Sequence, residues 1–293
     1  MNGYRRAMNE QGESRVPTGH GIGSVGGEVY VLSTGDAGES RLEMLNTLYG
    51  RRTEELLEEL GIAPGMRVAD VGCGVGTIVA WEAGRVAPGG IAVGIDKSEA
   101  QLDEATKRAA ASELGNVQVV CASAYAIDLP DASFEIVGCR SLLSHLVDPQ
   151  AAVREMARLV KPGGFLICED IDMRTIHTDP PSRAYDRIVE LYYALGDVTN
   201  CDYSVGARLA DLIAAAGLEV LGSRSDQPGP RTGDAKRWWE LTFIETAPAM
   251  KSAGVLTDEE FTSLCAQIAP LGMDTTTAIF QPRHFQSWGR KAT

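Results

Sequence analysis

The sequence predicts an α/β fold built on an open, mostly parallel sheet. Between residues 66 and 170, five short apolar runs alternate with segments of helical periodicity. This is the pattern of parallel strands joined by right-handed crossover helices. The runs are continuously apolar, as expected of strands that are covered on both faces. A glycine-rich loop follows the first run, at the carboxyl end of a strand, where an open α/β sheet has its ligand site.

The first part of the chain, residues 1–60, is expected to form an arm and a lid helix. Residues 1–29 are polar and rich in glycine, so we expect a flexible arm that a bound ligand orders. Leucines then recur at helical spacing over residues 38–60, and a glycine and a proline end this helix. The remainder, residues 61–293, is interpreted as the main domain.

The elements of the main domain follow in order along the chain. Strands are predicted at 66–71, 91–96, 117–122, 134–140 and 164–170. Helices are predicted from the glycine loop to about residue 86, at 98–112 and at 149–159. A further helix at 205–216 and a sixth strand at 217–225 come later.

Two inserts are expected to form a helical cap, at about residues 171–204 and 228–275. The first has helical character in its second half, and the second contains helices at about 234–247 and 257–269. The segment 277–288 is predicted as the last strand, and Pro282 favours an edge position or a bulge for it.

The charge balance argues against a nucleic-acid or anionic membrane partner. The chain has 40 acidic and 27 basic residues, a formal charge of −13, and no Lys/Arg-rich run that could form a local phosphate-binding patch. No apolar stretch approaches the ~20 residues of a membrane span. The first residues lack the apolar core of a secretory signal. We therefore expect a cytoplasmic protein.

The six cysteines are expected to be reduced core residues. None forms a CxxC pair, and Cys121, Cys139 and Cys168 fall in predicted buried strands. No set of histidine, cysteine and carboxylate residues has metal-ligand spacing, so no metal site is predicted.

The clearest motif is VADVGCGVGT at residues 68–77. Its glycines allow the backbone to approach a ligand closely, and the amides of the following helix favour a carboxylate or phosphate. Asp70 precedes the loop, and Asp96 ends the next strand, where its carboxylate can accept hydrogen bonds from a ribose diol. The spacing is GxGxG with Thr77 in the sixth position, whereas a nicotinamide dehydrogenase would show GxGxxG. The ordered pattern favours a nucleoside-containing cofactor over a structural turn.

With these motifs the chain resembles the class I S-adenosylmethionine-dependent methyltransferases, from about residue 61 to residue 225. The resemblance rests on DVGCGVGT, VGIDKSEAQL and LPDASFEIVGCRSLLSHLVDPQAAVREMARLVKPGGFLICED. The last segment is similar to the small-molecule branch, which includes ubiquinone-type and sugar or antibiotic O-methyltransferases. The resemblance implies a Rossmann-like seven-stranded sheet with an antiparallel last strand, and S-adenosylmethionine as the cofactor.

The resemblance also implies which residues bind the cofactor. Asp70 and the loop glycines hold the methionine part, Asp96 binds the ribose hydroxyls, and Lys97 flanks the adenine. The family usually has an aspartate after the third strand, where this chain has Ser123, whose hydroxyl can accept the same hydrogen bond from the adenine amino group. Together with two residues near the first helix, the predicted set is Tyr30, Arg41, Asp70, Gly72, Gly74, Gly76, Asp96, Lys97, Ser123, Ala124 and Arg140.

Tyr30 and Arg41 are included because they flank the start of the lid helix. There they are placed to close over the cofactor, with Arg41 meeting a carboxylate. An ordinary aromatic anchor and a surface arginine are the alternative.

Two residues at the same edge are predicted to be catalytic. His145 and Asp170 follow strands, and they match a histidine and an aspartate that act in catalysis in similar sugar O-methyltransferases. A hydroxyl or ammonium acceptor must lose a proton, so a general base assists the transfer. We predict His145 as that base, oriented by Asp170. A structural role for His145 and the use of Glu169 in place of Asp170 remain open.

Aromatic residues of the two inserts have two interpretations. Their helical spacing is typical of core positions, but a cap could also use them as walls of an acceptor pocket. They are Tyr185, Tyr192, Tyr193, Trp238, Trp239 and Phe243.

The sequence therefore predicts methyl transfer from S-adenosylmethionine to a small-molecule acceptor, such as a specialised metabolite. One alternative is an NAD-dependent oxidoreductase on a similar sheet, which the loop spacing disfavours. Another is a protein of the same fold, such as a cyclase, that has kept the cofactor without transferring its methyl group. The acceptor atom and the oligomeric state remain open.

Overall fold

The computed structural model describes residues 24–25, 28–29 and 36–293, with side chains from Leu42 onward. The chain divides into two compact units, Met1–Tyr30 and Val31–Thr293. In the first unit, two short strands pair antiparallel, β1 (Ser24–Val25) and β2 (Glu28–Val29). The rest of the predicted ligand-ordered arm and the neighbouring Tyr30 lie outside the described residues.

A seven-stranded sheet forms the centre of the second unit, with the order β5-β4-β3-β6-β7-β11-β9. The strands from β3 to β7 are parallel to one another, whereas β11 is antiparallel to both of its neighbours. This confirms the predicted mostly parallel α/β sheet with an antiparallel last strand. The strands are β3 (Arg67–Val71), β4 (Ile91–Asp96), β5 (Val117–Cys121), β6 (Phe134–Arg140), β7 (Val160–Asp172), β9 (Glu219–Asp226) and β11 (Arg283–Arg290).

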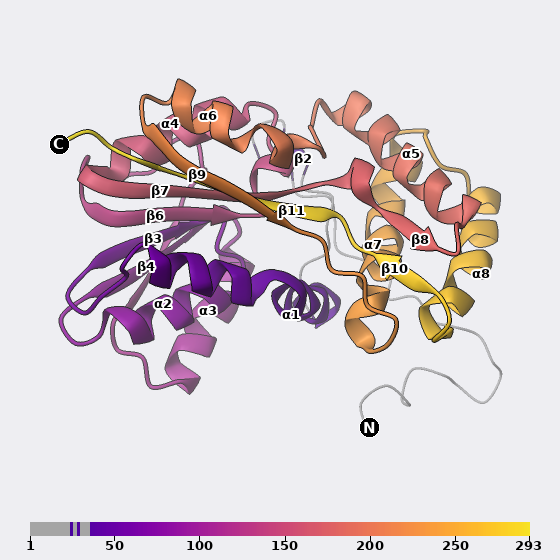
Figure 1. Ribbon diagram of the computed structural model, residues 1–293, viewed down its shortest axis with the longest axis horizontal. Coiled ribbons are helices and arrows are strands. Elements are labelled where there is room, and N and C mark those ends of the chain that lie inside the picture. The colour runs from indigo at the N-terminus through magenta and orange to yellow at the C-terminus, as the bar shows by residue number, and fades with distance from the viewer. Residues whose placement is uncertain (1–23, 26–27, 30–35) are drawn as a thin grey trace. The chain divides into compact units, whose positions relative to one another are not determined.

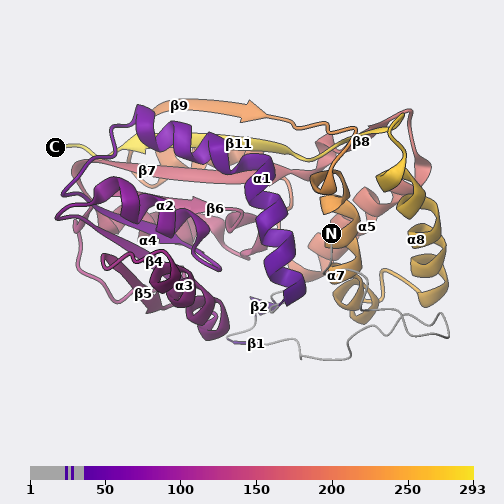
Figure 2. The ribbon, with the colours of Figure 1, turned by 90° about the horizontal axis from the view of Figure 1, so that it is seen from below.

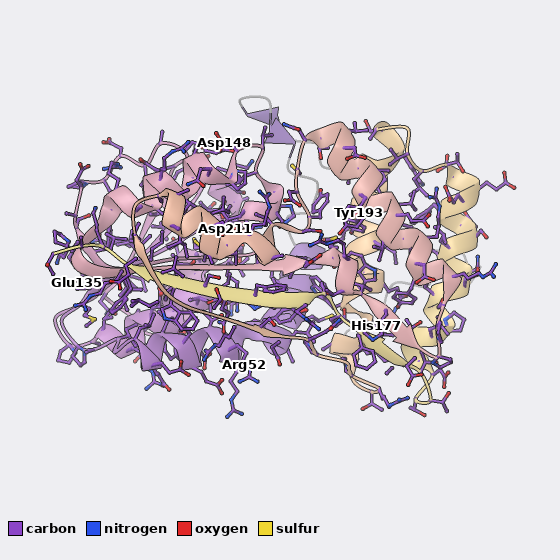
Figure 3. All side chains as sticks on the ribbon, turned by 45° about the horizontal axis from the view of Figure 1, so that its top comes forward. Arg52, Glu135, Asp148, His177, Tyr193 and Asp211 are labelled. Atoms are coloured by element: carbon purple, nitrogen blue, oxygen red, sulfur yellow. The ribbon has the colours of Figure 1, made fainter. Side chains whose placement is uncertain are left out.

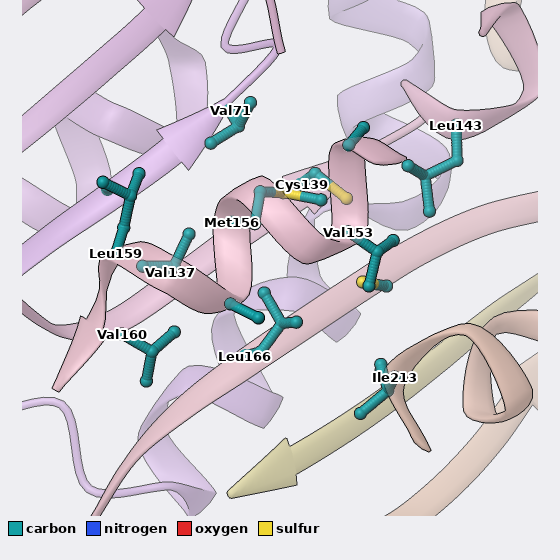
Figure 4. Close-up of a cluster of buried hydrophobic side chains, with 14 of the residues drawn as sticks. Val71, Val137, Cys139, Leu143, Val153, Met156, Leu159, Val160, Leu166 and Ile213 are labelled. Carbon is teal, nitrogen blue, oxygen red and sulfur yellow. The ribbon is translucent and has the colours of Figure 1, made fainter. Parts of the chain in front are cut away.

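Helices cover both faces of this sheet (Figure 1). One face carries α1 (Asp36–Glu59), α2 (Thr77–Val86) and α3 (Glu99–Ala111), and the other carries α4 (Pro149–Leu159) and α6 (Leu209–Ala215). Each layer has its own apolar core, which explains why the strands are apolar on both sides. Figure 4 shows the core on the α4 and α6 face of the sheet, in which side chains of these two helices pack onto β6 and β7.

Helices α3 and α4 begin where the sequence supplies a cap. Asp148 accepts a hydrogen bond from the Ala151 amide (2.9 Å) at the start of α4, and Pro149 takes the first helical position. Ser98 accepts a bond from the Gln101 amide (3.4 Å) at the start of α3. These local signals are the reason that both helices start within a residue of the predicted positions.

Further helices lie beyond the carboxyl ends of the parallel strands (Figures 1 and 2). They are α5 (Arg183–Thr199), α7 (Trp238–Ser252) and α8 (Asp258–Met273). They share a third apolar core with the first half of α1, and a two-stranded sheet of β8 (His177–Asp179) and β10 (Ala278–Phe280) lies among them. Short 3-10 helices connect these parts, at Leu143–His145, Met173–Thr175, Val205–Arg208 and Asp234–Arg237.

The prediction of one last strand over 277–288 was wrong. The segment breaks at Gln281 and Pro282 into β10, which pairs with β8, and β11, which pairs with β7 and β9. Proline has no amide hydrogen to donate, so it lies at the break, where no ladder bond is required of it. Its carbonyl instead accepts a hydrogen bond from the Tyr49 hydroxyl (2.7 Å). The strand after Pro282, β11, pairs with β7 on one side and β9 on the other, so it is internal to the sheet and not at its edge.

Two smaller expectations also differ from the structure. Cys121 is exposed, because β5 is the edge strand of the sheet. Strand β7 begins at Val160 instead of residue 164, so the polar and glycine-rich residues before Phe165 are part of it. Among the described residues, no helix has both the length and the apolar character needed to cross a membrane.

Candidate cofactor and catalytic site

The glycine loop joins β3 to α2 in a backbone path that needs glycine. Gly72 and Gly76 have φ values of 75° and 74°, in the left-handed region that side chains disfavour. A Cβ atom on Gly76 would lie 2.7 Å from the Ala105 Cβ, and one on Gly72 would lie 2.9 Å from a methyl of Leu142. The loop is also anchored to β4, since the Gly72 amide donates to the Ile95 carbonyl (2.7 Å). The sequence motif thus corresponds to a fixed loop at the carboxyl edge of the sheet.

Asp96 lies directly against this loop. Its Oδ2 accepts a hydrogen bond from the Gly74 amide (3.0 Å), and its Oδ1 accepts one from the Ser98 amide (2.9 Å). An ionised carboxylate has about four lone-pair sites, so each oxygen can accept a further bond from a ligand hydroxyl. The side chain is only partly buried, which keeps those sites accessible.

The predicted adenine contacts lie beside Asp96. The Ala122 amide donates to the Asp96 carbonyl (3.0 Å), which brings the end of β5 next to the end of β4. Ser123 begins a turn in which its carbonyl accepts from the Ala126 amide (3.1 Å), and its hydroxyl is exposed. Lys97 is also exposed, and Ala124 is partly buried. The structure therefore brings these predicted residues together at one end of the edge.

On the other side of the loop, Asp70 is buried at the end of β3. Its pKa is raised to about 7, chiefly by burial and also by the nearby Glu169 and Asp96, against the Arg140 guanidinium, which lowers it. Glu82 of α2 is also buried, and burial together with Asp70 and Glu169 raises its pKa well above the ordinary value. Acidic groups thus gather at the α1 and α2 side of this edge.

Arg140 ends β6 and contacts helix α1. Its Nη2 donates to the Asn46 Oδ1 (3.1 Å), and its Nη1 donates to the Thr53 Oγ1 (3.4 Å). The Thr53 hydroxyl donates in turn to the Glu169 Oε2 (2.8 Å). Asn46 and Thr53 were not among the site residues predicted from the sequence. They are polar residues seven positions apart, on one face of a leucine-rich helix. This spacing was the feature of the sequence that could have indicated a polar contact on that face.

The side chains of Glu169 and Asp170 make their hydrogen bonds on different sides of the sheet, Glu169 with helix α1 and Asp170 with the turn after β6. Glu169 lies against α1 and close to His284, whose Nε2 is 3.7 Å from its Oε2. His284 is buried and stacks on Tyr49, and burial lowers its pKa to about 3, so its ring is neutral at physiological pH. His284 was not among the site residues predicted from the sequence.

Asp170 supports the turn that carries His145. Its Oδ2 accepts from the Ser144 amide (3.1 Å), and its Oδ1 accepts from the Ile171 amide (2.8 Å). Burial raises its pKa to about 6, while these amides favour the ionised form. His145 is partly buried and lies edge-on to the Tyr203 ring, with 6.1 Å between ring centroids. The bond from the Ser144 amide therefore places the Asp170 carboxylate against the backbone next to His145.

Most aromatic residues of the inserts belong to the core. Trp238, Trp239, Phe243, Tyr185 and Tyr192 are all less than 4% exposed, and they pack in the third apolar core. Tyr193 of α5 is the exception among the six predicted aromatic residues, because it is only half-buried (Figure 3). Its hydroxyl shares a 2.5 Å hydrogen bond with the Ser204 hydroxyl. Their helical spacing is that of packed core positions.

Two predicted residues lie outside what the structure describes in full. Tyr30 is not described, and of Arg41 only the helical backbone within α1 is described.

Comparison with known proteins gives the family. A family model described as a methyltransferase domain matches residues 69–168, the segment that runs from β3 and its loop to β7. This segment is a class I S-adenosylmethionine-dependent methyltransferase domain. The predicted resemblance is thereby confirmed.

Curated relatives agree in sequence with this domain. The chain is 30% identical over 233 residues to an uncharacterized 37.1 kDa protein in transposon TN4556 of Streptomyces fradiae, covering 73% of this chain and 65% of that protein. It is 34% identical over 168 residues to a ubiquinone biosynthesis O-methyltransferase of Neisseria meningitidis, covering 55% and 66% of the two chains. The chain thus spans slightly less than two thirds of the length of each.

Solved structures share the fold. A methyltransferase-like protein from Bacillus halodurans C-125 superposes with a TM-score of 0.58 at 19% identity, over 82% of this chain and 98% of that one. The [4+2]-cyclase SpnF superposes with a TM-score of 0.54 at 17% identity, over 86% and 93%. The chain therefore shares the fold of these structures outside the matched segment as well.

Proposed function

We propose that this protein transfers the methyl group of S-adenosylmethionine to a small-molecule acceptor. The observation that carries the proposal is the bond between the Gly74 amide and the Asp96 carboxylate, which joins the glycine loop to the second acidic residue at one edge of the sheet. Open α/β sheets bind their ligands at this edge.

The residues at the edge fit the cofactor. The loop presents backbone without side chains, as a closely approaching ligand requires. Two buried polar atoms, the Gln101 Oε1 beside Gly74 and the Ser141 Oγ directly after β6, have no hydrogen-bond partner among the described residues. Such atoms are costly unless a ligand or water satisfies them. Both are therefore added to the proposed cofactor contacts.

The cofactor contacts are assigned along the edge. Gly72, Gly74 and Gly76 with Asp70 hold the methionine part, and Asp96 binds the ribose hydroxyls. The adenine lies between Lys97 and the turn at Ser123 and Ala124. Arg140 and, from the lid helix, Arg41 complete the proposed set.

The catalytic part of the proposal concerns the acceptor. When bound, the cofactor supplies a methyl group on a sulfonium sulfur, and this sulfur leaves as a neutral thioether when the bond to the methyl group breaks. His145 takes the proton of a hydroxyl or ammonium acceptor, and Asp170 holds the turn that carries His145 through the Ser144 amide. Positioning of the acceptor supplies much of the remaining catalysis.

The substrate class and the cellular setting are proposed on chemical grounds. The formal charge of −13 disfavours a nucleic-acid acceptor, and the helices beyond the strand ends supply the material for a small-molecule pocket. We place the protein in the cytoplasm and its acceptor among specialised metabolites. Residues 1–60 serve as arm and lid, and the inserts at 171–204 and 228–275 form the cap.

Two experiments test the proposal. Calorimetric titration with S-adenosylmethionine, S-adenosylhomocysteine and NAD should give binding of the first two only. Comparison of the metabolites of producer cells with and without the gene should then show a compound 14 Da heavier when the gene is present. Binding of NAD alone would support the oxidoreductase. Cofactor binding together with a product of unchanged mass would support a non-methylating enzyme of this fold.

A further inference from the structure

Arg140 has an unusual electrostatic setting for a partly buried arginine. It lies on β6 between two acidic residues, Asp70 on β3 and Glu169 on β7, and interacts electrostatically with both. No carboxylate of the described residues comes within the 4.0 Å of an ion pair. Its two hydrogen bonds to other side chains go to neutral groups of helix α1. Three of the five guanidinium N–H groups therefore have no side-chain partner among the described residues.

Thr53 keeps Arg140 apart from Glu169. The Thr53 hydroxyl accepts from the guanidinium and donates to the carboxylate, so it stands between two opposite charges that would otherwise pair. Asn46 holds the other terminal nitrogen. Because both bonds come from α1, the position of this helix sets the direction of the guanidinium.

Gly50 of the same helix makes room for Asn46. A Cβ atom built on Gly50 would lie 2.2 Å from the Asn46 Oδ1 and 2.7 Å from its Cγ. Glycine is unfavourable in a helix interior, and here its missing methyl group is the space that the Asn46 carboxamide occupies. A methyl group at this position would force the carboxamide away from Arg140.

The ligand that suits this arrangement is a zwitterion. The Arg140 guanidinium and the Asp70 carboxyl group lie on neighbouring strands without forming an ion pair, so a ligand with a carboxylate and an ammonium can contact both. Arginine is the side chain best suited to bind a carboxylate through two hydrogen bonds. The amino-acid end of the proposed cofactor is such a zwitterion.

We infer that Asn46, Thr53 and Gly50 of helix α1 are positioning residues that aim Arg140 at the carboxylate of the cofactor's amino-acid end. This inference rests on the proposed function. It makes α1 a part of the binding site, because a shift of the helix would move the Arg140 guanidinium and so change the hydrogen bonds between Arg140 and the ligand carboxylate.

The test compares two ligands that differ in this end. S-adenosylhomocysteine carries the amino-acid group, and 5′-methylthioadenosine lacks it. Calorimetric titration of Arg140→Met should give a loss of about 10- to 100-fold in affinity for the first ligand, as expected for a hydrogen-bonded charged group. Asn46→Ala should lose about 3- to 10-fold, as expected for a neutral hydrogen bond. Neither variant should change the affinity for 5′-methylthioadenosine by more than about twofold.

Three further variants separate positioning from a merely structural role. In the Arg140→Met background, Asn46→Ala should have no further effect on S-adenosylhomocysteine, since its effect acts through Arg140. Thr53→Ser should retain wild-type affinity, whereas Thr53→Val should not. Gly50→Ala should keep or raise the unfolding temperature, because alanine favours the helix, and still weaken S-adenosylhomocysteine binding. The control is Thr47→Ala, an exposed residue of α1 whose hydroxyl bonds within its own helix.

The outcomes are distinct. Equal losses for both ligands, unchanged binding of S-adenosylhomocysteine in Asn46→Ala and Gly50→Ala, or an Asn46→Ala effect that persists without Arg140 would overturn the inference while the proposed function stands. Failure of the wild-type protein to bind either ligand would overturn the proposed function itself. If Arg140 instead binds a carboxylate of the acceptor, Arg140→Met should have normal affinity for S-adenosylhomocysteine and a raised KM for the acceptor. This result would also overturn the inference.

Discussion

The Asp170 carboxylate accepts a hydrogen bond from the Ser144 amide (3.1 Å), which ties the end of β7 to the 3-10 turn after β6. Residues 26 positions apart in sequence thus fix the place of His145, the next residue of the turn. This contact gives Asp170 a role through the backbone, and it leads to two separate predictions.

The first prediction concerns His145. A neutral imidazole ring has one nitrogen that can accept a proton. His145→Ala should lower the turnover number about 10²- to 10⁴-fold, the usual contribution of a general base, with little change in cofactor affinity. Steady-state kinetics between pH 6 and 9 should also show one ionisation fewer. His177→Ala, at an exposed histidine that stacks on Phe280 in the small sheet, is the control (Figure 3). Unchanged turnover across this pH range would show that His145 is structural.

The second prediction concerns Asp170 and the pH dependence of stability. Burial raises its pKa from 3.8 to about 6, so the folded state binds this proton more tightly than the unfolded state. The stabilisation is fully present below pH 4 and is lost as the pH rises to about 6, by about 3 kcal/mol for this difference in pKa.

Asp170→Asn cannot ionise and should lack this pH dependence. Urea unfolding at pH 4, 5, 6 and 7 should therefore give a difference in unfolding free energy between the variant and the wild type that changes across the window, in favour of the variant at higher pH. A difference that is constant from pH 4 to pH 7 would mean that Asp170 is ionised in the folded state throughout.

The third prediction concerns the glycine loop. Gly76→Ala places a side chain at φ 74° and 2.7 Å from the Ala105 Cβ, so it should lower the free energy of unfolding by about 1–2 kcal/mol or more. Gly84→Ala is the matched control in α2, where an added Cβ meets nothing within 4 Å, and it should raise that free energy by about 1 kcal/mol. Chemical denaturation measures both. Equal effects of the two substitutions would contradict the strain assigned to the loop.

The sequence was informative wherever a signal was local. Short apolar runs predicted the strands from β3 to β6 to within a residue, and capping residues such as Asp148 and Ser98 located the helix starts. The glycines and the acidic residues of the edge were found because a ligand loop needs them in a fixed order.

The sequence was uninformative wherever a feature depends on contacts between distant residues. The break at Pro282 follows from the choice of β8 or β7 as partner strand, which no neighbouring residue reveals. The bonds from Arg140 to Asn46 and Thr53 join residues 94 and 87 positions apart. The exposure of Cys121 depends on which strand lies at the edge, and this is settled only by the whole sheet.

The most direct measurement is a calorimetric titration of S-adenosylmethionine into the wild type and Asp96→Ala. Asp96 holds the loop through the Gly74 amide and is proposed to bind the ribose, so its loss should weaken binding by about 1.5–3 kcal/mol, the worth of hydrogen bonds to a charged group. The control is Asp103→Ala, which removes an exposed aspartate from α3 and should leave the affinity unchanged. Tight binding to the wild type and a selective loss in Asp96→Ala are the predicted result. Equal affinity in a folded Asp96→Ala protein would contradict the assignment of this edge as the cofactor site.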